Sequence, residues 1–159
     1  MGQKTVVFVA RDAAPSGCFK LLEPVLKDCG FGVTLFTGGG RPLAEQPHEI
    51  TSAIRGAGVV VLGMSSSAEL AQPEIAAGQV AREAEVPFGF YGDVSGCWVR
   101  AKNPAWFWGL AVDAAFYCGV TQQDADAAKQ VFPNAKLIGT GNPLREEMAF
   151  PNFTRDRSH

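Results

Sequence analysis

The amino-acid sequence predicts an α/β protein, a three-layer sandwich in which a mostly parallel sheet of about six strands lies between helices. Short apolar runs rich in valine and phenylalanine recur along the chain, and segments with apolar residues at helical spacing separate most of them. Strands alternating with helices are typical of a parallel sheet covered on both faces. The expected architecture is therefore Rossmann-like.

Each predicted strand is a short apolar run bounded by glycine, proline or polar residues. In chain order these runs are Lys4–Ala10, Gly32–Thr37, Val59–Gly63, Val86–Tyr91, Ala114–Cys118 and Lys136–Gly139. The first, KTVVFVA, has the β-branched content of a buried strand. The last ends at Asn142-Pro143, and we expect Leu144–Met148 to form a short closing helix over the sheet.

Helices are predicted between these strands. After a loop at Arg11–Gly17, apolar residues from Cys18 to Cys29 share one helical face, and Gly30 ends the helix. Pro24 predicts a kink or a late start there. Further helices are expected at His48–Arg55, from Ser65 to the mid-eighties, and at Gln122–Phe132.

One segment, Gly92–Val112, interrupts the alternation with a long loop that carries Trp98, Trp106 and Trp108. Long loops in compact domains are commonly functional or involved in contacts. The tryptophans could stack on a base or sugar ring, seal a homodimer, or be buried in the core.

Composition narrows the classes of function. The formal net charge of -2 gives no reason to expect a nucleic-acid partner, and no apolar run approaches the roughly 20 residues of a membrane span. The N-terminus lacks a signal-peptide layout, and the four cysteines are scattered, without a zinc-binding pattern. We expect a reduced, cytoplasmic protein with a single domain over residues 1–150 and a polar tail at 151–159.

Ligands of such sheets bind beyond the carboxyl ends of the strands, so the loops there supply the candidate residues. The nucleotide-binding patterns GxGxxG and GxxxxGK[ST] are absent. Ser16 and Gly17 at a helix start could present N–H groups to an anion, although a plain N-cap at Ser16 is the simpler interpretation. Arg41, after three glycines, could bind a phosphate, or the glycines could form only a flexible turn.

The cluster Ser65-Ser66-Ser67 with Glu69 is the most suggestive polar stretch. Serine hydroxyls at a helix start can bind a phosphate or a sugar, and Glu69 can accept from sugar hydroxyls. Ser66 and Glu69 also have the spacing of a capping box.

Other candidate residues follow the later strands. Asp93, with Arg100 nearby in the chain, could act as a general base or hydroxyl acceptor, or could only stabilise a turn. Gly141 and Asn142 follow the sixth predicted strand and complete the set of candidate ligand-binding residues. We predict no metal site, and possible ligands are a nucleotide or a nucleotide sugar.

Four stretches together resemble the N-terminal domain of GT-B type glycosyltransferases and of the related UDP-N-acetylglucosamine 2-epimerases. They are VVFVARDAAPSGCFKLLEPVLKDCGFGVTLFTG, AGVVVLGMSSS, VPFGFYGDVSGCWVR, and DAAFYCGVTQQDADAAKQVFPNAKLIGTGNPLREE. In that family a strand reading roughly vxGNP precedes the crossing into a C-terminal domain, and Thr140–Pro143 resembles it.

The resemblance implies that the chain holds an acceptor and a general base. The C-terminal domain that supplies most nucleotide-sugar contacts in the family has no counterpart here, so a partner subunit would have to provide it. Two other functions remain open. One is a small enzyme similar to nucleoside deoxyribosyltransferases, with Glu69 or Glu74 as nucleophile and Asp93 assisting. The other is a non-catalytic interaction domain that dimerises through the tryptophan loop.

Overall fold

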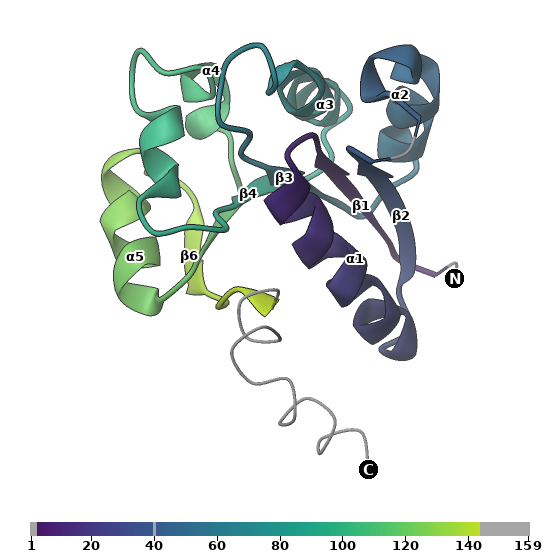
Figure 1. Cartoon of the computed structure of the whole chain (residues 1–159), viewed down its shortest axis with the longest axis horizontal. Coiled ribbons are helices and arrows are strands. Elements are labelled where there is room, and N and C mark those ends of the chain that lie inside the picture. The colour runs from purple at the N-terminus through teal and green to yellow at the C-terminus, as the bar shows by residue number, and fades with distance from the viewer. Residues whose placement is uncertain (1–2, 40, 144–159) are drawn as a thin grey trace.

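Six parallel strands form one sheet in the computed structural model, which describes residues 3–39 and 41–143. In sequence order they are β1 (Thr5–Ala10), β2 (Gly32–Thr37), β3 (Val59–Gly63), β4 (Phe88–Tyr91), β5 (Phe116–Gly119) and β6 (Lys136–Gly139). Their order in the sheet is β2-β1-β3-β4-β5-β6. All six predicted strands are confirmed, and so is the α/β class (Figure 1).

Five α-helices and three 3-10 helices connect the described strands. They are α1 (Ala13–Asp28), η1 (Leu43–Glu45), α2 (Pro47–Arg55), α3 (Gln72–Glu83), η2 (Cys97–Ala101), α4 (Trp108–Ala111), α5 (Gln122–Ala127) and η3 (Ala128–Gln130). Several predicted boundaries are wrong. α1 begins directly after Asp12 and contains Pro24, α3 begins at Gln72 rather than Ser65, and η2 and α4 lie within the expected long loop.

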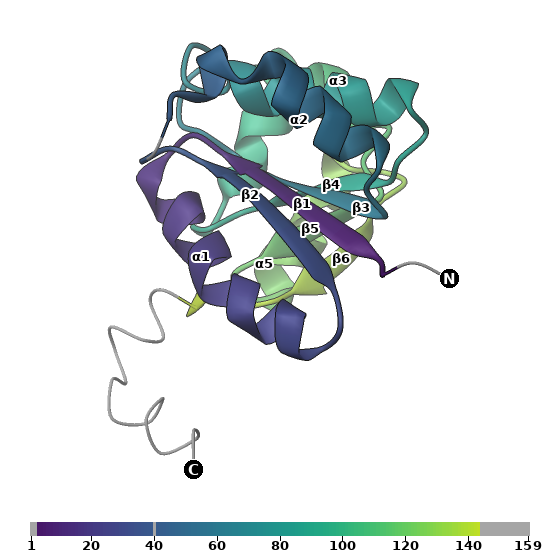
Figure 2. The ribbon, with the colours of Figure 1, turned by 90° about the vertical axis from the view of Figure 1, so that its right-hand side faces the viewer.

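The helices lie on both faces of the sheet, as a three-layer sandwich requires. The β1–α1–β2 crossover runs in the opposite direction to the later crossovers, and right-handed crossovers therefore place α1 on the opposite face from the other helices. Figure 2 shows α1 below the sheet, with α2 and α3 above it. The predicted closing helix at 144–148 and the tail at 151–159 lie outside the described residues.

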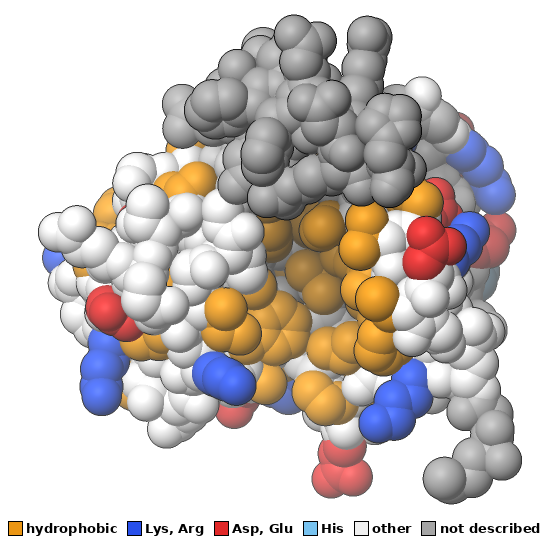
Figure 3. Space-filling view, turned by 90° about the horizontal axis from the view of Figure 1, so that it is seen from below, with side chains coloured by type: hydrophobic (Ala, Val, Ile, Leu, Met, Phe, Trp, Pro, Cys, Tyr) orange, Lys and Arg blue, Asp and Glu red, His pale blue; other side chains and the backbone are white. Residues whose placement is uncertain are grey.

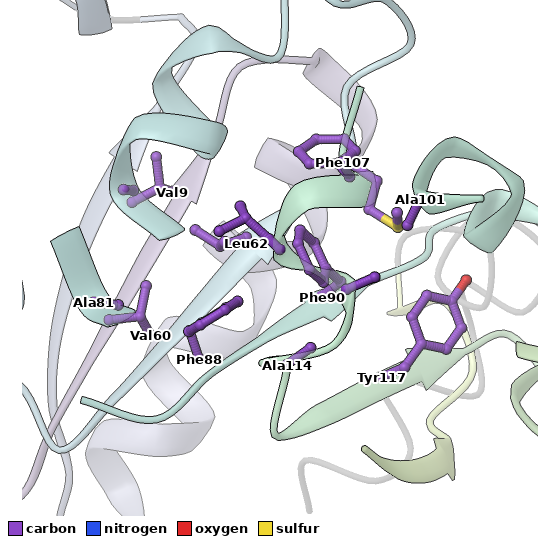
Figure 4. Close-up of a cluster of buried hydrophobic side chains, with 14 of the residues drawn as sticks. Val9, Val60, Leu62, Ala81, Phe88, Phe90, Ala101, Phe107, Ala114 and Tyr117 are labelled. Atoms are coloured by element: carbon purple, nitrogen blue, oxygen red, sulfur yellow. The ribbon is translucent and has the colours of Figure 1, made fainter. Parts of the chain in front are cut away.

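The larger core lies between the sheet and helices α2 to α5. Phe90 is fully buried at its centre, and its ring meets Phe107 at 5.2 Å and Phe132 at 5.6 Å between centroids. Figure 4 shows Phe90 and Phe107 together with Leu62 from the neighbouring strand. These contacts join the 92–112 segment to the sheet and so give it a fixed position.

The smaller core lies between the sheet and α1. Phe8 and Phe19 pack at 4.6 Å between ring centroids. On the central strand β3, the side chains facing this core, Val59 and Val61, are only partly buried, whereas Val60 and Leu62 on the other face are fully buried. Figure 3, viewed from below Figure 1, shows hydrophobic side chains gathered around a hollow. Among the described helices, α1 is therefore an incomplete cover for this face.

Candidate functional site

The topological switch point lies between β1 and β3. The chain leaves β1 toward β2 on one side and leaves β3 toward β4 on the other, so the two loops diverge beyond the carboxyl ends of neighbouring strands. Open parallel sheets bind ligands in the crevice at this position. The candidate site is therefore built from Arg11-Asp12 after β1 and from residues 64–71 after β3.

Glu74, on α3, links these two loops through hydrogen bonds to the backbone of each. Its side chain is fully buried, Oε1 accepts from the N–H of Ser65 at 2.9 Å, and Oε2 accepts from the N–H of Arg11 at 3.3 Å. Gly63 leaves room for the carboxyl group, because a Cβ there would lie 2.9 Å from Oε2. Burial raises the pKa of Glu74 to about 8, against the opposing effect of the hydrogen bonds. This buried group ties the loops together and does not line the cleft described below, so it is poorly placed to act as a nucleophile.

Asp12 forms a second link between the same loops. It occupies the N-cap position of α1, yet its side chain makes no cap bond. Instead its Oδ2 accepts from the N–H of Ser66 at 2.8 Å, and its own N–H donates to Ser65 Oγ at 3.1 Å. The β1 and β3 loops therefore form one hydrogen-bonded unit.

Ser16 lies inside the first turn of α1, so the prediction that it caps the helix is wrong. Its buried hydroxyl donates to the carbonyl of Ala10 at 3.1 Å and accepts from the N–H of Gly38 at 3.3 Å, joining the ends of β1 and β2. Gly17 lies beside it in the same helix. The early helix start explains the error, because α1 forms its first turn directly from the end of β1.

The serine cluster also differs from its prediction. Ser65 is buried, Ser66 is exposed, and Ser67 Oγ accepts from the N–H of Leu70 at 3.2 Å in a local turn. Because α3 begins only at Gln72, the capping box proposed for Ser66 and Glu69 does not form. Glu69 is instead an exposed side chain above the crevice.

The segment after β4 reaches back to the β3 loop through two side chains. Arg100 Nη1 donates to the carbonyl of Met64, and Trp106 Nε1 donates to the carbonyl of Ser65 at 3.0 Å. Trp98 and Trp106 are half-buried, whereas Trp108 is exposed. Arg100 and Trp106 thus fix the loop that carries the serine cluster.

A cleft of about 550 Å³ opens beside this unit, between α2 and α3. Its walls are mainly apolar: Pro42, Leu43, Ala44, Pro47, Ile50, Leu70, Pro73, Ala76, Ala77 and Val80. The charged residues that line it are Arg11 and Glu69, and Thr51 and Gln72 add polar groups. Its size is within the usual range of small-molecule sites.

Arg11 is the arginine available at this cleft. Its backbone is held by Glu74, while within residues 3–39 and 41–143 its guanidinium has no salt bridge and no hydrogen bond. Arg41, the predicted phosphate ligand, does not line the cleft; it pairs with Glu49 at 3.2 Å and donates to the carbonyl of Glu45 at 2.8 Å. The position of Arg11 directly after the first strand was the signal in the sequence that could have identified it.

The other predicted residues form a separate group around the end of β6. Asn142 Nδ2 donates to the carbonyl of Asp93 at 2.6 Å, Cys18 Sγ contacts Asn142 Oδ1 at 3.4 Å, and Tyr91 donates to the carbonyl of Gly141 at 3.1 Å. Asp93 and Asn142 are buried, and neither lines the cleft. The structure therefore brings Asp93, Gly141 and Asn142 together, whereas Glu69 lies apart from them at the α2–α3 cleft.

Fold and site together define a Rossmann-like α/β protein with an apolar cleft between α2 and α3, beside the switch point. Among the described residues, no group of three or more histidine, cysteine, aspartate or glutamate side chains could hold a metal ion, and no helix is both long and apolar enough to cross a membrane. Comparison with models of known protein families and with curated protein sequences finds no match.

Proposed function

We propose that the protein binds a small molecule in the α2–α3 cleft and serves as the acceptor-holding part of a glycosyltransferase of the GT-B kind. The observation that carries this proposal is the cleft itself, which opens beside the switch point and has Arg11 and Glu69 among its lining residues. The Rossmann-like sheet and the sequence resemblance agree with this proposal. The donor would be a nucleotide sugar bound largely by a partner subunit.

Glu69 is the candidate general base in this proposal. Its carboxylate is exposed and lines the cleft, where it can accept a proton from an acceptor hydroxyl, whereas Asp93 is buried away from the cleft. The four cysteines, all within the described residues, form no disulfide, which is compatible with a reducing, cytoplasmic location.

The test is calorimetric titration of the protein with UDP, UDP-N-acetylglucosamine and inorganic phosphate, each with and without a blocked cleft. Ala76→Phe fills the cleft from an exposed position on α3, and Ala127→Phe is the matched control on α5, outside the cleft. We expect weak binding of at least one polar probe that Ala76→Phe removes and Ala127→Phe preserves. Binding that survives Ala76→Phe would contradict the assignment of the cleft.

An interaction surface is the second candidate function. Four of the five exposed large hydrophobic side chains among the described residues lie in the 92–112 segment: Val94, Val99, Trp108 and Val112. Several exposed apolar side chains on one segment are typical of a contact surface. Light scattering after size exclusion tests this function: we expect a dimer that Trp108→Ser dissociates, and a monomeric wild-type protein over the micromolar range would remove the homodimer.

A further inference from the structure

Building on the proposed function, we infer that the ligand of the α2–α3 cleft is an amphipathic molecule, with an apolar body between the helices and an anionic group at Arg11. The inference rests on the asymmetry of the cleft. Its walls are apolar side chains from both helices, and its charged lining residues are Arg11 and Glu69, from the loops after β1 and β3.

The apolar walls define the body of the ligand. Leu43 and Ile50 from the α2 side face Ala77 and Val80 of α3 across the cleft, and the two helices pack against each other. A nucleotide or a sugar would lose hydrogen bonds to water there, because within the described part of the chain Thr51 and Gln72 are the only uncharged polar side chains that line the cleft. A hydrocarbon chain loses none, and burying each CH₂ group tightens binding about fourfold.

Arg11 defines the charged group of the ligand. Its guanidinium has no partner within the described ranges, and the bond from its backbone N–H to Glu74 fixes the position of the residue. Guanidinium binds carboxylate and phosphate groups through paired hydrogen bonds, so both head groups share the chemistry required here. No salt bridge joins Arg11 to Glu69 although both line the cleft, so the guanidinium remains free to bind a ligand.

The charge of Glu69 should oppose the binding of an anionic ligand at Arg11. The Glu69 carboxylate and the anionic group of the ligand repel each other, and because the cleft is partly open to solvent this repulsion weakens binding only modestly. Glu69→Gln should therefore bind an anionic amphiphile a few times more tightly than the wild-type protein does, whereas Arg11→Gln should bind it at least tenfold more weakly.

The experiment is calorimetric titration of the full chain with octanoate, decanoate, decyl phosphate and decanol, beside UDP-N-acetylglucosamine. Arg55→Gln is the control for Arg11→Gln, since Arg55 is an exposed arginine on α2 that does not line the cleft. We expect decanoate to bind about an order of magnitude more tightly than octanoate. Ala76→Phe should abolish this binding, and Arg11→Gln should weaken decanoate but leave decanol unchanged.

The probes separate the possible failures. If UDP-N-acetylglucosamine binds and Ala76→Phe prevents it while decanoate does not bind, the inference is overturned and the proposed function stands. If none of the probes binds, both fail. Equal affinities for decanol and decanoate would overturn the role of Arg11, and the comparison of decanoate with decyl phosphate shows which head group is preferred.

Discussion

Glu74→Gln should remove a pH dependence of folding that originates at the switch point. The pKa of Glu74 rises from an ordinary 4.5 to about 8 because the carboxyl group is buried. Between these values the folded state holds one proton more than the unfolded state does. The contribution of Glu74 to the free energy of unfolding is therefore complete below about pH 4.5 and decreases as the pH rises toward 8.

The one-proton difference between the folded and unfolded states sets how steeply the free energy of unfolding falls with pH. Each pH unit within the window lowers the free energy of unfolding by about 1.4 kcal/mol, so the loss from pH 5.5 to 7.5 is on the order of 3 kcal/mol. This is a large part of the stability of a domain of this size. The cysteine and tyrosine side chains whose pKa is raised titrate at about 11 or higher, outside the window.

Glutamine cannot ionise, so the variant should have a flat stability profile over the same range. Its amide oxygen can still accept from Ser65, but the bond from Arg11 is lost, at a cost of about 1–3 kcal/mol at low pH. The two profiles therefore converge as the pH rises. Urea unfolding at pH 5.5, 6.5 and 7.5, followed by tryptophan fluorescence, measures both curves.

Glu83→Gln is the matched control, since Glu83 is an exposed residue at the end of the same helix. It should keep the wild-type slope. A wild-type protein whose unfolding free energy does not fall between pH 5.5 and 7.5, or a Glu74→Gln variant that keeps the slope, would refute the reasoning.

Three further predictions concern packing, the tryptophan segment and the thiols. Gly63→Ala should destabilise by about 1–3 kcal/mol in urea unfolding, because its Cβ would meet three groups at 3.0 Å or less, whereas Gly109→Ala, with open space around it, should be neutral. Trp106→Phe should cost about 1–3 kcal/mol by leaving the Ser65 carbonyl without its donor, whereas exposed Trp108→Phe should change stability by less than about 0.5 kcal/mol. Iodoacetamide at pH 8 should label Cys29 first, because it is the exposed one of the four cysteines, all of which lie in the described residues; rapid labelling that persists in Cys29→Ser would contradict this assignment.

The strands could be predicted from sequence because each depends on its own residues. VVVLG at β3 is apolar at every position except its final glycine, and a strand buried in a parallel sheet needs nothing more. Helix starts were less predictable. Asp12 and Ser66 have the residue types of caps, yet they bond to each other's loop, a partner 54 positions away in the sequence.

Of the two charged residues that line the cleft, the sequence analysis named Glu69 but not Arg11. The rule that ligands bind beyond the carboxyl ends of the strands selected all the strand-end loops, and only the order of strands in the folded sheet places the switch point between β1 and β3. The choice between two arginines depended on their neighbours. Arg41 is neutralised by Glu49, whereas the Arg11 side chain is free within the described residues, and this difference in pairing arises only in the folded chain.

The sequence by itself determined the α/β class and the number of strands, because periodic apolar burial is a local property of the chain. Tertiary structure alone decided that Glu74 is buried with a raised pKa, that α2 and α3 enclose an apolar cleft, and that Asp93 lies apart from Glu69. These outcomes depend on which distant side chains come to lie opposite one another, since desolvation and ion pairing arise only once the chain has folded.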